Sequence, residues 1–187
     1  MNILVAVEGI DGTGKTTNAK MLANRLGAMY YKTPAPIFDD ARRIFNECGD
    51  VTAKYLFYLA TLKLASNSIK EILEKRSVVV DRWLATTICY HCLFGSRIDT
   101  VNVDKLEIIK PVATFCLTCN DKDEWTKRMI ERGDIQSSKE YERFNHLSHL
   151  IVAFNSKENG LIIDTGLIPP SKTTQKMVMF LEKQHLI

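Results

Sequence analysis

Five short runs of apolar residues occur along the chain, and none of them alternates cleanly between apolar and polar positions. These runs cover residues 3–8, 28–32, 77–80, 113–119 and 160–164. A strand with one wet face alternates with a period of two, whereas a strand covered on both faces is apolar almost throughout. The pattern therefore predicts five strands that are buried on both sides.

The segments between these runs carry apolar residues at the spacing of an α-helix. In residues 15–26, for example, Ala19, Leu22 and Leu26 recur every three or four positions. Helices are predicted over residues 15–26, 39–48, 51–75, 84–94, 103–109, 140–157 and 170–183, with another between a cap at Asn120 or Asp121 and Gly133. Because strands that alternate with helices form parallel sheets with right-handed crossovers, we expect an α/β protein, a three-layer α/β/α architecture around a five-stranded parallel sheet.

Length and composition fit one globular domain. The chain has 187 residues, 45% of them apolar and 25% charged, so residues 1–187 can form a single core. With 25 Lys and Arg against 22 Asp and Glu, the net charge of +3 is too small for binding bulk nucleic acid through its phosphates. No apolar run approaches the roughly 20 residues of a membrane span. We therefore expect a soluble, cytoplasmic protein whose partner is a small molecule.

The five cysteines include two CxxC pairs, Cys89 with Cys92 and Cys116 with Cys119. Two such pairs could bind zinc, but the second pair falls in a predicted strand, where residues three apart point to opposite faces. An odd number of cysteines without an export signal also favours reduced thiols. We therefore expect no zinc site.

The strongest motif is GIDGTGKT, which matches the pattern G-x-x-x-x-G-K-[ST] between a predicted strand and a predicted helix. Glycines at these spacings let backbone N–H groups surround a phosphate, and the N-terminus of the following helix attracts the same anion. The lysine, Lys15, would bridge the β and γ phosphates of ATP, and the hydroxyl of Thr16 would bind Mg²⁺. The predicted ATP-binding residues are Gly9, Gly12, Thr13, Gly14, Lys15, Thr16 and Thr17.

Two further charged groups follow predicted elements near this motif. Asp81 and Arg82 come directly after the third strand, at the sheet edge where open α/β folds bind ligands. A carboxylate there can bind Mg²⁺ together with Thr16, and a guanidinium can clamp a second anion, although an exposed ion pair has the same sequence pattern. Arg128 and Arg132 precede a polar segment, so they form either a lid over the phosphates, at about residues 128–142, or a solvated helix face.

In combination, these motifs resemble the thymidylate kinase family of nucleoside monophosphate kinases along nearly the whole chain. Residues 8–17 are similar to the family's EGIDGxGKTT, residues 81–83 to its DR-aromatic motif, and Arg128 with Arg132 to its lid arginines. Gly12, where some relatives carry an arginine, is typical of the subgroup whose catalytic arginine comes from the lid.

The resemblance implies a P-loop kinase fold with a helical lid and ATP- and Mg²⁺-dependent transfer of the γ-phosphoryl group to a (deoxy)pyrimidine nucleoside monophosphate such as dTMP. The implied catalytic residues are Lys15, Asp81, Arg82, Arg128 and Arg132. It also implies that residues 165–166 contact adenine, and that a homodimer could form through the helix predicted over residues 51–75.

The same resemblance implies an acceptor site. Asp11 would contact the sugar 3′-hydroxyl, Phe57 would stack on the base and Tyr90 would disfavour a 2′-hydroxyl, while Arg82 would hold the acceptor phosphate. The implied acceptor-site residues are Asp11, Lys32, Phe57, Arg82, Thr87, Tyr90 and His91, and either Glu140 or Glu142 would match the acidic residue of the lid.

Three departures from the family concern the choice of acceptor. The family's Arg-Glu-Pro is Lys32-Thr33-Pro34 here, its thymine-reading Arg is Thr61, and its Gln is His91. Losing a charge-assisted hydrogen bond to the base costs about 1.5–3 kcal/mol, enough to change the preferred nucleotide. His91 either supplies the missing donor or is structural.

Two other functions fit the same fold. A deoxynucleoside kinase would need a carboxylate after the second strand to accept the proton of a sugar hydroxyl, and this chain has Lys32 and Thr33 there. A non-catalytic nucleotide-binding module would not need the lid arginines, which this chain retains. The sequence therefore favours a phosphate acceptor and a working kinase.

Overall fold

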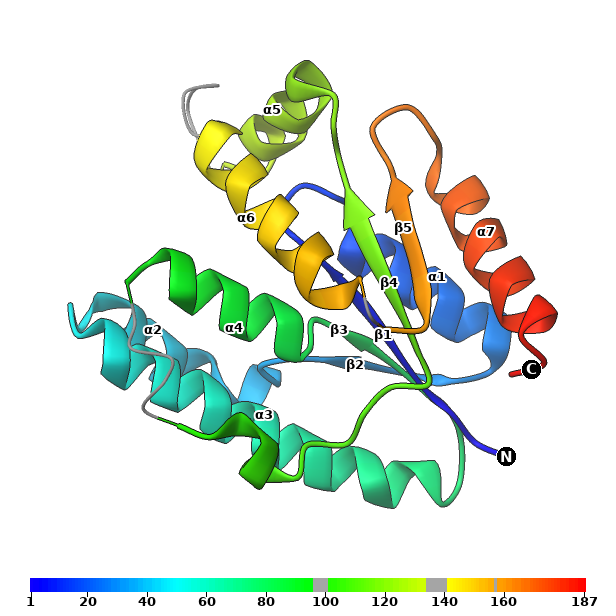
Figure 1. The fold of residues 1–187 in the computed structure, drawn as a ribbon, viewed down its shortest axis with the longest axis horizontal. Helices are drawn as coiled ribbons and strands as arrows, with labels where there is room; N and C mark the ends of the chain where they lie inside the picture. Colours follow the sequence, from blue (N-terminus) through cyan, green and yellow to red (C-terminus); the bar gives the residue numbers. More distant parts are fainter. Residues whose placement is uncertain (96–100, 134–140, 157) are drawn as a thin grey trace.

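Five parallel strands form the centre of the computed structural model, which describes residues 1–95, 101–133, 141–156 and 158–187. The strands pair in the order β2-β3-β1-β4-β5 (Figure 1). Their bounds are β1 Leu4–Gly9, β2 Met29–Lys32, β3 Val78–Asp81, β4 Ala113–Thr118 and β5 Gly160–Asp164. The five predicted strands are thus confirmed, with ends that agree to within one residue.

Helices cover both faces of this sheet, as the three-layer prediction required (Figure 1). The helices are α1 Lys15–Leu26, α2 Asp39–Glu47, α3 Val51–Leu73, α4 Leu84–Leu93, α5 Lys122–Glu131, α6 Tyr141–Asn155 and α7 Pro170–Lys183. Apolar residues of α1 and α7 pack with Val5 and Val7 of β1, whereas those of α3 pack with Leu4 and Ala6 on the opposite face. No helix in the described part of the chain is long and apolar enough to cross a membrane.

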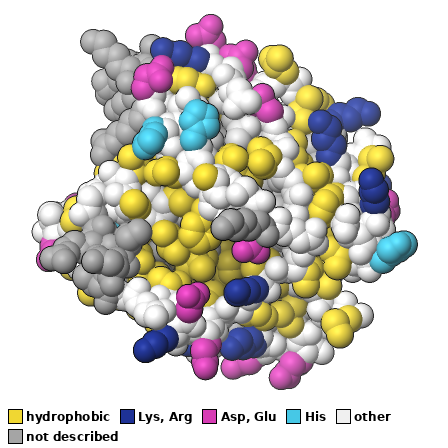
Figure 2. All heavy atoms as spheres, viewed as in Figure 1, with side chains coloured by type: hydrophobic (Ala, Val, Ile, Leu, Met, Phe, Trp, Pro, Cys, Tyr) yellow, Lys and Arg dark blue, Asp and Glu magenta, His cyan; other side chains and the backbone are white. Residues whose placement is uncertain are grey.

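The face covered by α3, α4 and α6 also holds most of the cysteines, and Figure 2 shows apolar side chains gathered in the middle of this face. Cys89, Cys116 and Cys119 belong to one apolar cluster, so the prediction that the last two point to opposite faces is wrong. The reason is that β4 ends at Thr118, and the chain turns before Cys119. Burial raises the pKa of Cys89 and Cys116 to about 12, which keeps both as thiols.

The helix predicted over residues 103–109 is shorter than expected. The structure has one 3₁₀ turn, η3 Val103–Leu106, which ends at Glu107 with a left-handed φ of 50°. Beyond it Ile109 donates its backbone N–H to Ser66 Oγ at 2.9 Å instead of continuing a helix. A second 3₁₀ turn, η1 Pro36–Phe38, precedes α2.

A buried carboxylate at the end of β1 fixes the start of α4. Glu8, which is 1% exposed, accepts hydrogen bonds from the backbone N–H of Ala85 at 3.0 Å and of Thr86 at 3.3 Å, and from the Thr86 hydroxyl. These donors are the free N–H groups of the first helical turn, which need acceptors when they are buried. Glu8 therefore sets the position of the helix that carries Thr87, Tyr90 and His91.

We expect Glu8→Ala to lower the free energy of unfolding by about 3 kcal/mol, because it leaves buried donors of α4 without an acceptor and opens a cavity. Urea denaturation followed by circular dichroism measures the change. Glu182→Ala, at an exposed position of α7, is the control and should change stability by less than about 0.5 kcal/mol. Equal effects of the two substitutions would contradict the capping role of Glu8.

Candidate active site

A cleft of about 890 Å³ opens at the carboxyl ends of the strands. Its walls come from the loop between β1 and α1, from the segments after β2 and β3, and from α2, α3, α4 and α5. Most of the residues predicted for the site line this cleft: Asp11, Gly12, Gly14, Lys15, Thr16, Thr17, Lys32, Arg82, Thr87, Tyr90, His91, Arg128 and Arg132. The sheet edge therefore brings together residues that are more than 100 positions apart in the sequence.

The phosphate-binding loop has the backbone that its glycines allow. Gly12 and Gly14 have φ values of 80° and 76°, and α1 begins at Lys15 directly after them. Gly12 lies against α5, where a Cβ atom would come within 2.9 Å of Trp125 Nε1 and 3.0 Å of Met129 Sδ. Position 12 therefore has no room for a side chain, and no arginine can be supplied from this position in the loop.

Lys15 is folded back onto the loop. Its Nζ donates a hydrogen bond to the carbonyl oxygen of Ile10 and lies 4.0 Å from Asp11 Oδ1. Burial, followed by the positive charge of Arg82, lowers the pKa of Lys15 to about 8. The ammonium group is thus poorly compensated in the protein alone, and a phosphate would supply the missing negative charge.

Three cations from different elements meet at one carboxylate. Asp11 Oδ1 accepts a hydrogen bond from Arg82 Nη2, and it lies 3.9 Å from Arg132 Nη1 and 4.0 Å from Lys15 Nζ. Burial alone would raise the pKa of Asp11, but the three cations outweigh it and hold the value at about 2. The arrangement is a concentration of positive charge beside the phosphate loop, which is what two neighbouring phosphate groups require.

Thr16 and Asp81 form a set of oxygen atoms suited to Mg²⁺. Thr16 donates its hydroxyl hydrogen to Asp81 Oδ2 at 2.6 Å, and Tyr30 donates to the same oxygen at 3.0 Å. Asp81 Oδ1 is buried and has no hydrogen-bond partner among the described residues. A free carboxylate oxygen beside a hydroxyl oxygen fits a hard divalent cation, so these two residues could hold the metal. Tyr30 was not identified from the sequence, because one tyrosine in an apolar strand gives no motif.

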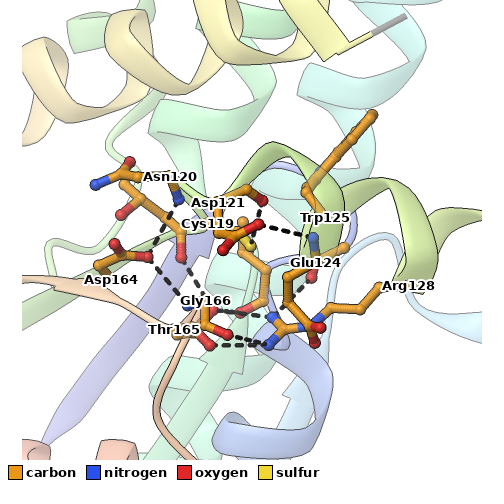
Figure 3. A network of polar contacts seen from close by, with 12 residues as sticks. Cys119, Asn120, Asp121, Glu124, Trp125, Arg128, Asp164, Thr165 and Gly166 are labelled. Carbon is orange, nitrogen blue, oxygen red and sulfur yellow. Dashed lines mark hydrogen bonds and ion pairs between the residues drawn. The ribbon is translucent and has the colours of Figure 1, made fainter. Parts of the chain in front are cut away.

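Arg128 occupies a different place from the one predicted for a lid arginine (Figure 3). It donates hydrogen bonds to the carbonyl oxygens of Thr165 at 2.8 Å, Gly12 at 3.3 Å and Gly166 at 3.4 Å, and its Nε donates to Glu124 Oε1 at 2.8 Å. The guanidinium therefore joins α5 and the phosphate loop to the segment after β5. These acceptors hold Arg128 beside Gly12 and Thr165, and its role as a lid arginine over the phosphates stays a prediction.

The helix α3 places Tyr58, not Phe57, in the cleft. The ring of Phe57 stacks on Phe45 with centroids 4.7 Å apart, whereas Tyr58 lines the cleft and donates its hydroxyl hydrogen to Asn46 Oδ1 at 3.2 Å. Neighbouring helical residues point about 100° apart, and Phe57 is directed toward Phe45 of α2. Leu62, one turn beyond Tyr58, also lines the cleft, beside Thr61. Phe57 is thus not among the residues that line the cleft, and its stacking on the acceptor base stays a prediction.

His91 is buried and does not supply the predicted donor. Its Nδ1 lies 2.7 Å from the carbonyl oxygen of Thr87, and because a carbonyl only accepts, Nδ1 must carry the hydrogen. Burial lowers the pKa of His91, so the ring is neutral and the other nitrogen, Nε2, is only an acceptor. Nε2 is buried without a partner among the described residues.

The remaining predicted positions lie at the rim or outside the cleft. Lys32 is exposed at the end of β2, and the ring of Tyr90 stacks on Phe94 at 4.5 Å. Glu142 is exposed and lies 3.9 Å from Lys122, and Glu140 is outside the described residues, as is most of the predicted lid at residues 134–140. Further polar residues that the sequence did not single out also line the cleft, among them Arg42, Asn46, Lys54, Thr86 and Glu131.

A phosphate loop whose Thr16 is hydrogen-bonded to Asp81, with the cations Arg82 and Arg132 beside Asp11, defines a P-loop nucleotide kinase site. The sequence model of the thymidylate kinase family matches residues 7–167, and the chain belongs to this family. A probable thymidylate kinase of Methanocaldococcus jannaschii is 29% identical over 168 residues, covering 88% of this chain and 87% of the relative. A probable thymidylate kinase of Methanococcus maripaludis strain C7 is 31% identical over 179 residues, with coverages of 88% and 87%.

Solved structures share the fold. The thymidylate kinase of Candida albicans superposes with a TM-score of 0.78 at 21% identity, covering 98% of this chain and 92% of that chain. The thymidylate kinase of Ehrlichia chaffeensis has a TM-score of 0.68, also at 21% identity, with coverages of 97% and 98%. The three-layer α/β architecture predicted from the sequence is therefore confirmed.

We expect Gly12→Ala to weaken ADP binding at least about tenfold, because the added Cβ meets Trp125 and displaces the loop. Isothermal titration calorimetry measures the affinity. The matched control is Gly49→Ala, which has a similar φ of 72° but open space around its Cβ. Both substitutions impose a left-handed alanine at a cost of about 1–2 kcal/mol, and only the first should change ADP binding. Equal ADP affinities in the two variants would contradict the steric explanation.

The lowered pKa of Lys15 predicts that ADP binding weakens as the pH rises above about 8. Above that pH the free protein has lost the Lys15 proton, and the proton must be taken up again to pair with phosphate, so affinity falls by up to about tenfold per pH unit. Isothermal titration calorimetry between pH 7 and about pH 10 tests this pH dependence. The upper limit lies close to the ordinary pKa of a lysine. Lys15→Ala should bind weakly with a flatter profile, and parallel profiles in the two proteins would show that another group titrates.

Proposed function

We propose that this chain transfers the γ-phosphoryl group of ATP to the phosphate of a (deoxy)pyrimidine nucleoside monophosphate such as dTMP. The observation that carries the proposal is the convergence of Lys15, Arg82 and Arg132 on Asp11 beside the phosphate loop. Relatives named probable thymidylate kinases over most of the chain length support the same activity.

On the donor side, the loop amides and the N-terminus of α1 bind the phosphates of ATP, and Lys15 moves from the Ile10 carbonyl to the β and γ phosphates. Thr16 and Asp81 would hold Mg²⁺, since they offer a hydroxyl oxygen and the free Oδ1. The metal would supply positive charge that offsets the charge of the ATP phosphates. Arg128 keeps Gly12 and the Thr165–Gly166 segment together, which fixes the loop relative to the site where adenine is expected.

On the acceptor side, Arg82 holds the monophosphate in line with the γ-phosphate, and Arg132 stabilises the charge that develops between them. Phosphate oxygens replace the Asp11 carboxylate as partners of these cations, which leaves Asp11 free for the sugar 3′-hydroxyl. Tyr58 stacks on the base, and Tyr90 disfavours a 2′-hydroxyl. A phosphate acceptor is already an anion, so the reaction needs no general base.

The carboxylates of the cleft favour a phosphate acceptor over a sugar hydroxyl. Two carboxylates are found among the described residues that line the cleft, those of Asp11 and Glu131. Asp11 is held by Arg82 with a pKa of about 2, which makes it a poor base, and the position after β2 is Thr33, whose hydroxyl donates to the Arg82 carbonyl at 2.7 Å. A deoxynucleoside kinase would need a free base at this end.

The oligomeric state stays a prediction. Leu56 and Leu64 of α3 and Ile44 of α2 are exposed apolar residues, and a homodimer through this pair of helices would cover them.

A coupled assay of ATP consumption over dTMP, dUMP, dCMP, UMP, CMP, dGMP, dAMP and thymidine tests the function. We expect a pyrimidine monophosphate to give the highest kcat/KM, and dTMP to exceed thymidine. Lys15→Ala should lower kcat/KM by at least about 100-fold, because it removes charge stabilisation from the transferred group. The control Lys176→Ala, at an exposed position of α7, should be unchanged.

Two results would replace this assignment. Faster turnover of thymidine than of dTMP would make the chain a nucleoside kinase. Binding of ADP without turnover of any acceptor would make it a non-catalytic nucleotide-binding module.

A further inference from the structure

Tyr30 lies beside the metal-binding carboxylate because of the register of two neighbouring strands. In the parallel pairing of β2 with β3, Tyr30 is opposite Val79 and Lys32 is opposite Asp81. Side chains two residues apart share a face of the sheet, so Tyr30 and Asp81 both lie on the face covered by α1. This brings the Tyr30 hydroxyl to 3.0 Å from Asp81 Oδ2, and Thr16 at the start of α1 lies 2.6 Å from the same oxygen.

The two oxygens of Asp81 are used differently. Oδ2 accepts hydrogen bonds from both Tyr30 and Thr16, whereas Oδ1 is buried without a partner among the described residues. Two donors on one oxygen fix the rotation of a carboxylate better than one donor can. Thr16 has given its hydrogen to Asp81, so its oxygen keeps lone pairs for another ligand.

The hydroxyl of Tyr30 is not explained by packing. The ring packs against the apolar cluster beneath α1, and the ammonium of Lys20 lies 5.4 Å from its centroid. A phenylalanine ring would make both contacts. A carboxylate oxygen only accepts, so the Tyr30 hydroxyl donates the hydrogen of its bond to Asp81 Oδ2.

We propose that Tyr30 is a positioning residue for the metal site: its hydroxyl holds Asp81 so that Oδ1 and the Thr16 oxygen face the divalent cation together. The inference rests on the proposed function in one respect, that Thr16 and Asp81 hold the metal. Outer hydrogen bonds of this kind orient metal ligands, and their loss lowers metal affinity by about 10- to 100-fold.

The test compares Tyr30→Phe with Tyr31→Phe. Tyr31 is the next residue of β2 and packs on the opposite face, against the cluster that contains α3. Electron paramagnetic resonance of free Mn²⁺, titrated into the protein with ADP, measures metal binding without turnover. We expect Tyr30→Phe to bind Mn²⁺ about tenfold more weakly than the wild type and Tyr31→Phe to match the wild type. In the kinase assay, Tyr30→Phe should raise the Mg²⁺ concentration for half-maximal rate by a similar factor, with the acceptor KM changed by less than about twofold.

Equal Mn²⁺ affinities of the two variants would overturn the role of Tyr30. The role of Tyr30 would also be overturned if Tyr30→Phe lost Mn²⁺ affinity tenfold and lost ADP affinity by the same factor in EDTA, where no metal is bound. Equal losses would indicate a general disturbance of the phosphate loop. The result is separate from the test of the function: weaker Mn²⁺ binding in Tyr30→Phe supports the positioning role even if every acceptor in the screen fails.

Discussion

The cleft depends on one electrostatic constraint, which is that several cations must be held close together before any phosphate arrives. Lys15, Arg82 and Arg132 would repel one another in a partly buried site, and Asp11 makes their approach possible by pairing with all three. The carboxylate therefore stabilises the ligand-free arrangement of the same groups that bind phosphate. Asp11 compensates these cations in part, and phosphate oxygens would supply the negative charge that Lys15 still lacks.

A second constraint joins α5 to the phosphate loop. Trp125 donates its indole N–H to the Asp11 carbonyl at 2.8 Å, Gly12 fits beneath the same ring, and Arg128 holds the Gly12 carbonyl and Thr165 (Figure 3). The helix α5 thus touches both the loop that binds phosphates and the segment after β5. A movement of α5 would therefore displace both the phosphate loop and the segment after β5. The contacts that would transmit it are hydrogen bonds of fixed direction and a ring packed against a glycine.

The features that could be predicted from the sequence are those that depend on local interactions along the chain. Most strand and helix bounds follow from apolar periodicity and from caps such as Asp121, one of the two candidates at the start of α5. Roles set by tertiary contacts could not be predicted this way. Whether Phe57 or Tyr58 faces the cleft depends on the phase of α3, and the carbonyl oxygens that hold Arg128 come from segments distant in the sequence. The hydrogen of His91 is likewise assigned by the Thr87 carbonyl, which no motif reveals.

The strand order affects how the protein folds while it is being synthesised. β1 is the middle strand and is made before both of its neighbours: β3 begins about 70 residues after β1, and β4 begins more than 100 residues after it. Until β3 and β4 have been made, β1 lacks both neighbouring strands, and an unpaired apolar strand is prone to pair wrongly. The phosphate loop that follows β1 is made before β3 and β4, but it reaches its native position only after these two strands have paired with β1.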